Sequence, residues 1–324
     1  MRYKDKIKEL RNVINNRLIP FIDNDYIYLD LPYHSNLGDT LIWEGTLRFL
    51  EQLPYKCVYS TNIDYYSKPV ISKDTIIILH GGGNWGDLWP AHHQFRKKVI
   101  EDFPENRVIV FPQSVYYQEQ KNLLEDASFY NAHPNVIICL RDYKSYEILN
   151  KHFPNKLLLV PDMAFFVDIS RYRRTVETNK ILFAKRADKE LSEELELNII
   201  PSRAEIHDWP TLDICPKYYK RLEKLHRCTE KVDHLFSVQI TYKVIDFYWK
   251  NIIRPHNVKT AIQFLCDYSV VYSTRLHVSI LSILLEKKSC VLDNNYAKTM
   301  NFLDTWFTKE EVGFFFNRPS DKGV

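Results

Sequence analysis

Two short segments of the chain contain residue types that could carry out a reaction. Residues 80–87 (HGGGNWGD) form a glycine-rich loop after the apolar run 75–79. Such a loop can present backbone N–H groups to an anion or a sugar. Residues 273–277 (STRLH) follow the apolar run 268–272. Arg275 can bind a carboxylate or phosphate through two parallel hydrogen bonds, and His277 is the side chain type that titrates near neutral pH. This pair predicts a site for an anionic substrate that must also be protonated.

The elements that position these segments alternate along the chain. Apolar, β-branched runs predict strands at residues 26–31, 75–79, 107–111, 136–140, 157–160, 180–184, 268–272 and 289–292. Helices are predicted at residues 40–52, 92–103, 118–131, 143–152, 218–235, 237–252, 260–266 and 277–286. This alternation predicts an α/β fold with two Rossmann-like domains that face each other across a cleft. We place the domains at residues 1–170 and 171–324, with the polar stretch 168–179 as the linker.

Sheets of this kind bind ligands beyond the carboxyl ends of their strands. The polar residues and glycines that follow the predicted strands are therefore the candidate site residues. In the first domain they are Asn36, Gly38, Asp39, Gly82, Gly83, Asn84, Trp85, Gln113, Arg141 and Asp162. In the second domain they are Lys185, Arg186, Ser273, Thr274, Arg275 and His277. We expect all of them to converge on one face.

Composition excludes several classes of protein. The 324 residues include 44 Lys and Arg against 41 Asp and Glu, for a net charge of +3, which does not indicate a nucleic-acid-binding protein. The charged N-terminal segment does not resemble a signal peptide, and no apolar run is long enough to span a membrane. The six scattered cysteines predict buried, reduced thiols rather than disulfides or a zinc site. We therefore expect a cytoplasmic protein.

Two further patterns match known binding or catalytic motifs only by letter. Gly81, Gly83 and Gly86 have the spacing of a dinucleotide-binding fingerprint, but Pro90 interrupts the helix that should follow. Residues 80–83 (HGGG) resemble the oxyanion loop of α/β-hydrolases, but the chain contains no G-x-S-x-G motif for the nucleophile, which argues against such an enzyme. We interpret His92 and His93 as surface histidines, because adjacent residues do not share a helix face on which to bind a metal.

The segment Lys217–Lys231 places basic residues along one face of a predicted helix. A basic amphipathic helix can lie against an anionic membrane, so peripheral membrane contact is one interpretation. The other is an ordinary solvated helix face.

Five motifs, taken in order, resemble the polysaccharide pyruvyltransferase family. They are residues 36–39 (NLGD), 81–84 (GGGN), Arg141-Asp142 with Ser145, 162–165 (DMAF) and 273–277 (STRLH). Met163 stands where the family usually has proline. The resemblance implies a fold like that of GT-B glycosyltransferases. It also implies transfer of pyruvate from phosphoenolpyruvate onto two hydroxyls of a sugar, which gives a cyclic ketal in the synthesis of a bacterial surface or capsular polysaccharide. No metal or other cofactor is generally required, and we expect an acceptor carried on a lipid diphosphate.

This chemistry assigns roles to the candidate residues. His277 would be the general acid, acting with Arg275, and Asp39 or Asp162 would accept a hydroxyl proton. Donor-binding residues would be Lys185, Arg186, Ser273, Thr274 and Arg275. Acceptor-binding residues would be Asn36, Gly38, Gly82, Gly83, Asn84, Trp85, Gln113, Arg141 and Asp162, with the Trp85 indole stacked on a sugar ring.

Two other functions would be compatible with such a fold. A nucleotide-sugar glycosyltransferase needs a carboxylate for the ribose hydroxyls in the second domain, and Glu286 is the candidate for it. A non-catalytic protein of carbohydrate assembly would lack a paired Arg and His.

Overall fold

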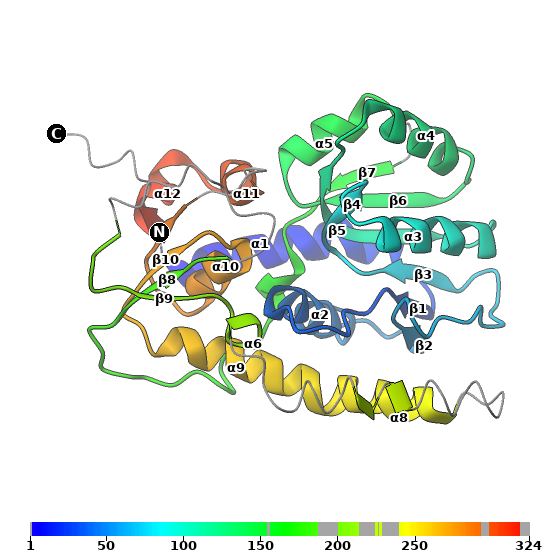
Figure 1. Ribbon diagram of the computed structural model, residues 1–324. Helices are drawn as coiled ribbons and strands as arrows, with labels where there is room; N and C mark the ends of the chain where they lie inside the picture. Colours follow the sequence, from blue (N-terminus) through cyan, green and yellow to red (C-terminus); the bar gives the residue numbers. More distant parts are fainter. Residues whose placement is uncertain are drawn as a thin grey trace.

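Two parallel β-sheets form the frame of the molecule in a computed structural model (Figure 1). The structure describes residues 2–153, 156–186, 200–213, 224–225, 227–228, 240–292 and 298–317. We call residues 2–166 the N-terminal unit and residues 181–317 the C-terminal unit. The proposed domain boundary at residues 170 and 171 lies between them.

The sheet of the N-terminal unit has the strand order β2-β1-β3-β5-β6-β7, with β4 paired to β5. Its strands are β1 (Tyr26–Leu29), β2 (Cys57–Thr61), β3 (Ile76–Leu79), β4 (Gly82–Gly86), β5 (Val108–Tyr116), β6 (Val136–Leu140) and β7 (Lys156–Leu159). The helices are α1 (Tyr3–Leu18), η1 (Ile19–Phe21), α2 (Leu37–Leu50), α3 (Pro90–Asp102), α4 (Gln120–Asn131), α5 (Tyr143–Asn150) and η2 (Met163–Phe166). Strands β3 and β6 are buried along their whole length, as expected for apolar strands inside a parallel sheet.

The sheet of the C-terminal unit has the order β12-β11-β10-β8-β9. Its strands are β8 (Ile181–Ala184), β9 (Glu205–His207), β10 (Val270–Ser273), β11 (Ser289–Val291) and β12 (Phe316–Asn317). The helices are α6 (Pro210–Asp213), α8 (Ile240–Tyr248), η4 (Trp249–Ile253), α9 (Arg254–Cys266), α10 (Leu276–Leu284), α11 (Lys298–Trp306) and α12 (Lys309–Phe315).

Two sets of helices connect the two units. The continuous run α8–η4–α9 passes below both sheets in Figure 1. Lys250 Nζ on this run donates a hydrogen bond to the backbone oxygen of Ser60 at 3.1 Å, and Arg254 forms an ion pair with Glu44 of α2. At the other side, Lys6 of α1 forms an ion pair with Glu311 of α12 at 3.1 Å.

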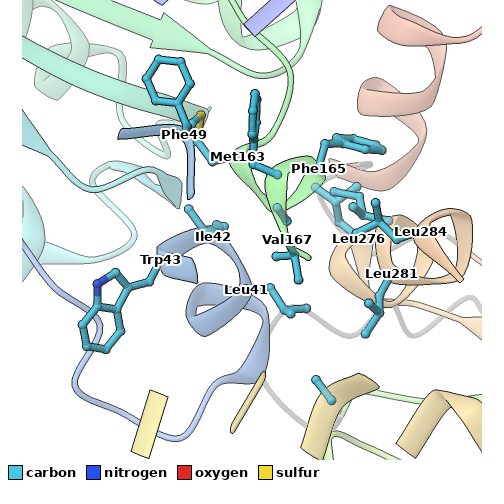
Figure 2. Close-up of a cluster of buried hydrophobic side chains, with 14 of the residues drawn as sticks. Leu41, Ile42, Trp43, Phe49, Met163, Phe165, Val167, Leu276, Leu281 and Leu284 are labelled. Atoms are coloured by element: carbon cyan, nitrogen blue, oxygen red, sulfur yellow. The ribbon is translucent and has the colours of Figure 1, made fainter. Parts of the chain in front are cut away.

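One hydrophobic core extends through both units. In Figure 2 the side chains of Leu41 and Ile42 from α2, Phe165 from η2, and Leu276 and Leu281 from α10 belong to one buried cluster. A shared core of this kind holds the facing ends of the two sheets in a defined position. The close approach of α2 to η2 requires glycine, because a Cβ on Gly45 would lie only 1.9 Å from the backbone oxygen of Met163.

The structure confirms an α/β fold with parallel sheets, and the GT-B-like arrangement of the units stays a prediction. The eight predicted strands are present, but β5 continues to Tyr116, and residues 82–86 of the predicted glycine loop form strand β4 against it. The helix predicted at 260–266 is the end of the longer run α8–η4–α9. Most of the predicted helix 218–235 lies outside the described residues. Cys139, Cys266 and Cys290 are buried as expected, whereas the prediction is wrong for the exposed Cys57 and Cys228.

Candidate active site

A cavity of about 540 Å³ lies between the carboxyl ends of the two sheets. Residues of the N-terminal unit form one side, the N-terminal wall: Asp30, Pro32, His34, Ser35, Asn36, Asp39, His80, Gly81, Gly83, Asn84, Trp89, His92 and Arg141. The other side, the C-terminal wall, consists of Arg186, Asp208, Trp209, Leu212, Arg275, Leu276, His277 and Lys298. Of the candidate residues from the sequence, Asn36, Asp39, Gly83, Asn84, Arg141, Arg186, Arg275 and His277 line the cavity.

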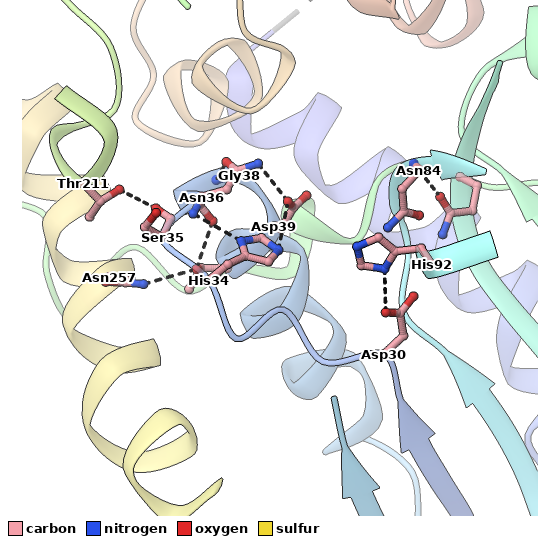
Figure 3. A network of polar contacts seen from close by, with 12 residues as sticks. Asp30, His34, Ser35, Asn36, Gly38, Asp39, Asn84, His92, Thr211 and Asn257 are labelled. Atoms are coloured by element: carbon pink, nitrogen blue, oxygen red, sulfur yellow. Dashed lines mark hydrogen bonds and ion pairs between the residues drawn. The ribbon is translucent and has the colours of Figure 1, made fainter. Parts of the chain in front are cut away.

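The start of α2 positions Asp39 at the cavity (Figure 3). Asn36 is the N-cap residue, and its side chain accepts a hydrogen bond from the Gly38 N–H at 3.0 Å. Its amide nitrogen donates to Asp39 Oδ2 at 2.8 Å, while His34 Nε2 lies 3.6 Å from the same oxygen. Burial raises the pKa of Asp39, but the neighbouring histidines His34 and His277 more than offset this and lower it. Asp39 is therefore an ionised hydrogen-bond acceptor at neutral pH.

Strand β4 brings the glycine-rich backbone to the cavity. Its first and last residues have positive φ values, 144° at Gly82 and 106° at Gly86, which favour glycine. Gln113 lies behind the strand, fully buried. Its Nε2 donates to the His80 backbone oxygen at 2.8 Å, and its Oε1 accepts from the Asn84 N–H at 3.4 Å. The predicted ligand contact of Gln113 is therefore wrong, because this side chain holds the β4 loop from inside.

Trp85 points away from the cavity. It is 2% exposed, its ring centroid lies 5.0 Å from that of Tyr130, and its Nε1 donates to Tyr117 Oη at 3.0 Å. The prediction that Trp85 stacks on a sugar is wrong, because its ring belongs to the core of the N-terminal unit. Trp89, which the sequence analysis passed over, lines the cavity and is 38% exposed.

Three histidines that the sequence analysis did not place in the site, His34, His80 and His92, line the N-terminal wall. His92 Nδ1 lies 2.8 Å from Asp30 Oδ1, and the interpretation of His92 as a surface residue is wrong. Burial lowers the pKa of His92, but the Asp30 carboxylate outweighs this and raises it. His80 is buried, and its Nδ1 is hydrogen-bonded to Tyr28 Oη. Desolvation lowers the pKa of His80 to about 4, so the ring is neutral at pH 7.

Asp30 has an unusual backbone conformation that only the structure reveals. It follows β1 directly and has a φ of 66°, a conformation that residues other than glycine adopt infrequently. Such conformations concentrate at functional sites. From the sequence alone, its position at the end of a predicted strand was the available signal.

His277, Asp162 and Arg141 form a chain of contacts at the boundary between the walls. Asp162 Oδ2 accepts from Arg141 Nη1 at 2.8 Å and lies 3.3 Å from His277 Nε2. Burial raises the pKa of Asp162, but His277 and Arg141 outweigh it and lower it strongly. The Asp162 side chain is only 1% exposed and lies behind the wall, so its predicted contact with the acceptor is wrong. Asp162 instead orients His277.

Arg275 belongs to a buried ion pair with Asp208, a residue that the sequence analysis missed. Its Nη2 donates to Asp208 Oδ2 at 2.7 Å, and its Nε bonds the other carboxylate oxygen. The two side chains are 6% and 4% exposed, so the guanidinium is held in one orientation at the wall. Asp208 follows β9, a short strand that the sequence analysis did not predict.

The remaining candidate residues support the walls from behind. Ser273 Oγ accepts from the Arg275 N–H at 2.9 Å, and Thr274 Oγ1 accepts from the Arg186 N–H at 3.0 Å. Lys185 does not line the cavity, and its backbone N–H is bonded to the His207 oxygen at 2.9 Å. The side chains of Ser273 and Thr274 are fully buried, so their predicted donor contacts are wrong, whereas the predicted donor contact of Lys185 stays a prediction.

Gly38 and Gly82 also support the site without lining it. A Cβ on Gly38 would lie 2.5 Å from His277 Nδ1, so glycine is needed for the histidine to pack against α2. A Cβ on Gly82 would lie 3.7 Å from Asp39 Oδ1, and this glycine borders the Asp39 carboxylate.

Within the described part of the chain, no group of three or more His, Cys, Asp or Glu side chains is arranged to hold a metal ion. The expectation of metal-independent chemistry stays a prediction. No helix among the described residues is long and apolar enough to cross a membrane.

The two parallel sheets thus bring cations and histidines together in one cavity between them. The polysaccharide pyruvyl transferase family matches residues 36–296, and the chain belongs to this family. It is 30% identical to EpsO of Bacillus subtilis (strain 168) over 94% of this chain and 90% of EpsO. It is 32% identical to Pyruvyl transferase 1 of Schizosaccharomyces pombe (strain 972 / ATCC 24843), over 86% and 68% of the two chains.

A solved structure has the same fold. The crystal structure of a functionally uncharacterized protein from Klebsiella pneumoniae subsp. pneumoniae NTUH-K2044 superimposes with a TM-score of 0.57 over 94% of both chains, at 21% identity. The family and the name of the yeast relative indicate that the present chain is a pyruvyl transferase.

Proposed function

We propose that the protein transfers pyruvate from phosphoenolpyruvate to two hydroxyls of a sugar and forms a cyclic ketal. One observation carries the proposal: His277, held by Asp162, stands in the cavity beside the cations Arg141 and Arg275. Phosphoenolpyruvate carries a carboxylate and a phosphate, and it must be protonated at its methylene carbon before a hydroxyl can add. The cavity offers both binding groups for anions and an acid.

The proposed reaction uses His277 as the general acid. Its proton goes to the methylene carbon C3 of the donor, which becomes a methyl group, and the neighbouring carbon C2 becomes electrophilic. A sugar hydroxyl oxygen bonds to C2 and gives its proton to Asp39. Inorganic phosphate then leaves with the electrons of its bond to C2 and takes up the proton from Asp39. The second hydroxyl oxygen bonds to C2 and gives its proton to the neutral His277, which restores both residues. Asp162 stays ionised throughout and keeps the His277 ring in place.

The N-terminal wall supplies acceptor binding in this proposal. Asn36, Asn84 and Asp39 offer hydrogen-bond partners for sugar hydroxyls, and Trp89 offers an exposed indole ring for the apolar face of the sugar. We now assign Arg141 to donor binding instead of acceptor binding, because it shares the Asp162 carboxylate with His277. We further propose a polysaccharide precursor on a lipid diphosphate as the acceptor, with the enzyme at the cytoplasmic membrane face. Most of Lys217–Lys231, the segment predicted to contact the membrane, lies outside the described residues.

The two alternative functions receive less support. Glu286, the candidate carboxylate for a nucleotide ribose, is not in the cavity lining and instead forms an ion pair with Arg173 at 3.3 Å. A non-catalytic assembly protein has no need of a histidine fixed by a buried carboxylate beside an arginine.

The direct test is to incubate the protein with a panel of sugars and either phosphoenolpyruvate or nucleotide sugars. Release of inorganic phosphate together with a pyruvate ketal on the sugar is the expected result. Release of a nucleoside diphosphate would identify a glycosyltransferase instead. Turnover of neither donor across the panel would favour the assembly protein.

A further inference from the structure

Lys298, a residue that the sequence analysis did not single out, brings a third cation to the C-terminal wall. It is the first residue of α11, yet its side chain crosses the cavity and reaches β4 of the other unit. Its Nζ donates a hydrogen bond to the Gly83 backbone oxygen at 3.3 Å. Lysine is rarely buried, but Lys298 is only 7% exposed. A buried lysine that reaches across the cavity indicates a role at the site.

Arg141 meets Lys298 above the same glycine. A Cβ placed on Gly83 would lie 3.0 Å from Arg141 Nη2 and 3.2 Å from Lys298 Nζ, so the two cationic nitrogens converge on one point. Arg141 Nε donates a hydrogen bond to Ser114 Oγ, and its Nη1 donates a hydrogen bond to Asp162. Among the described residues, its Nη2 has no hydrogen-bond partner. Since like charges repel, two converging cations favour an anion that binds both.

From this geometry we propose that Arg141 and Lys298 form the subsite for the phosphate of the donor, and that Gly83 is glycine to leave room for it. This assignment rests on the proposed function and adds the orientation of the donor within the cavity. A phosphate dianion has three terminal oxygens, enough to accept from both cations at once. The carboxylate of the donor then lies toward Arg275 and Arg186.

The contacts of Asp162 support this orientation. Its Oδ2 binds Arg141 on one side and faces His277 on the other, at 2.8 and 3.3 Å. In phosphoenolpyruvate the phosphate oxygen and the methylene carbon are attached to the same carbon, C2. A phosphate at Arg141 and Lys298 therefore places the methylene carbon beside the His277 ring. The phosphate also stays in contact with both cations while it leaves and gains negative charge.

The test measures binding of inorganic phosphate and of pyruvate separately, by thermal unfolding at constant ionic strength. Phosphate stands for the leaving group and pyruvate for the carboxylate end of the donor. Lys298→Gln should weaken phosphate binding about tenfold or more and leave pyruvate binding within about twofold, because one charged hydrogen bond is lost. Lys298→Arg should retain most of the phosphate affinity. Lys309→Gln, at the exposed start of α12, is the matched control and should change neither.

Each other outcome is informative. If Lys298→Gln unfolds, chemical modification of lysines in the wild-type protein decides the matter: phosphate, but not pyruvate, should protect Lys298, and equal modification with and without phosphate would overturn the subsite. Equal phosphate binding by the wild type and a folded Lys298→Gln protein would overturn the subsite and leave the proposed function standing. Loss of pyruvate binding alone would overturn it by reversing the donor. A wild-type protein that binds neither phosphate nor pyruvate would count against both the subsite and the proposed function.

Discussion

The two walls of the cavity differ in charge and in the way their side chains are held. The C-terminal wall has three cations, Arg186, Arg275 and Lys298, against the one carboxylate of Asp208. The N-terminal wall has the carboxylates of Asp30 and Asp39 against Arg141, together with three histidines. A cationic wall suits an anionic donor, whereas carboxylates and amides suit the hydroxyls of a sugar. In the proposed function, the C-terminal wall therefore supplies most of the cations for the donor, with Arg141 added from the N-terminal wall, and the N-terminal wall supplies the groups for the acceptor.

The largest expected effect is on His277, which lies where the walls meet. His277→Gln preserves much of the size and polarity but removes the acid. We expect kcat to fall by about 10²-fold or more, with the donor dissociation constant nearly unchanged. Steady-state kinetics and donor titration measure the two quantities. His256→Gln, on α9 outside the cavity, is the control. A near wild-type kcat would show that His277 serves only in packing against Gly38.

A pH measurement tests the buried environment of His80 on the N-terminal wall. The pKa of His80 is about 4 in the folded protein and about 6.5 when unfolded, so the unfolded chain binds more protons between these values. The stability that the neutral ring contributes is complete above pH 6.5 and is lost as the pH falls through 4. We expect about 3 kcal/mol from this source.

The variant His80→Asn should flatten this acid limb of the stability profile, measured by urea unfolding between pH 4 and 7. His34, with a lowered pKa, adds to the slope, and His92, with a raised pKa, opposes it. Comparison with the wild type isolates the part due to His80. An unchanged profile in His80→Asn would mean that the pKa of His80 is the same in the folded and the unfolded protein.

The third prediction concerns Arg275 of the C-terminal wall. Arg275→Lys retains the charge but cannot use the planar fork that binds Asp208 through two nitrogens. We expect donor affinity to fall by about tenfold or more, since a charged hydrogen bond contributes about 1.5–3 kcal/mol. Acceptor affinity should stay nearly constant, as measured by initial rates at saturating donor. Arg173→Lys, in an exposed ion pair, provides the control. An equal loss of affinity for donor and acceptor would show that Arg275 is not specific to donor binding.

The sequence was sufficient for the frame of the site and insufficient for its details. Apolar runs such as β3 and β6 are visible from composition, and strand ends correctly located Asp39, Arg141 and His277. Side-chain direction depends on strand pairing. The glycine-rich segment pairs with β5, and this pairing turns Trp85 into the core.

Long-range partners were also invisible in the sequence. Asp208 follows a three-residue strand, too short for a reliable apolar pattern, and Lys298 opens a helix that was not predicted. His92 pairs with Asp30 across 62 residues, a contact that no local spacing indicates.

The smallest expected effect tests the acceptor side of the comparison through two tryptophans. Trp89 lines the N-terminal wall at 38% exposure, and Trp85, four positions earlier, is buried at 2%. Trp89→Ala should raise the KM for the sugar several-fold, because stacking contributes about 1 kcal/mol, and should hardly change stability or donor affinity. Trp85→Ala should instead destabilise the protein by about 3–5 kcal/mol through the cavity it leaves. Sugar kinetics and chemical unfolding of both variants decide between these roles. If Trp89→Ala weakened the affinity for the donor as much as that for the sugar, Trp89 would contact both substrates, and its assignment to acceptor binding would fail.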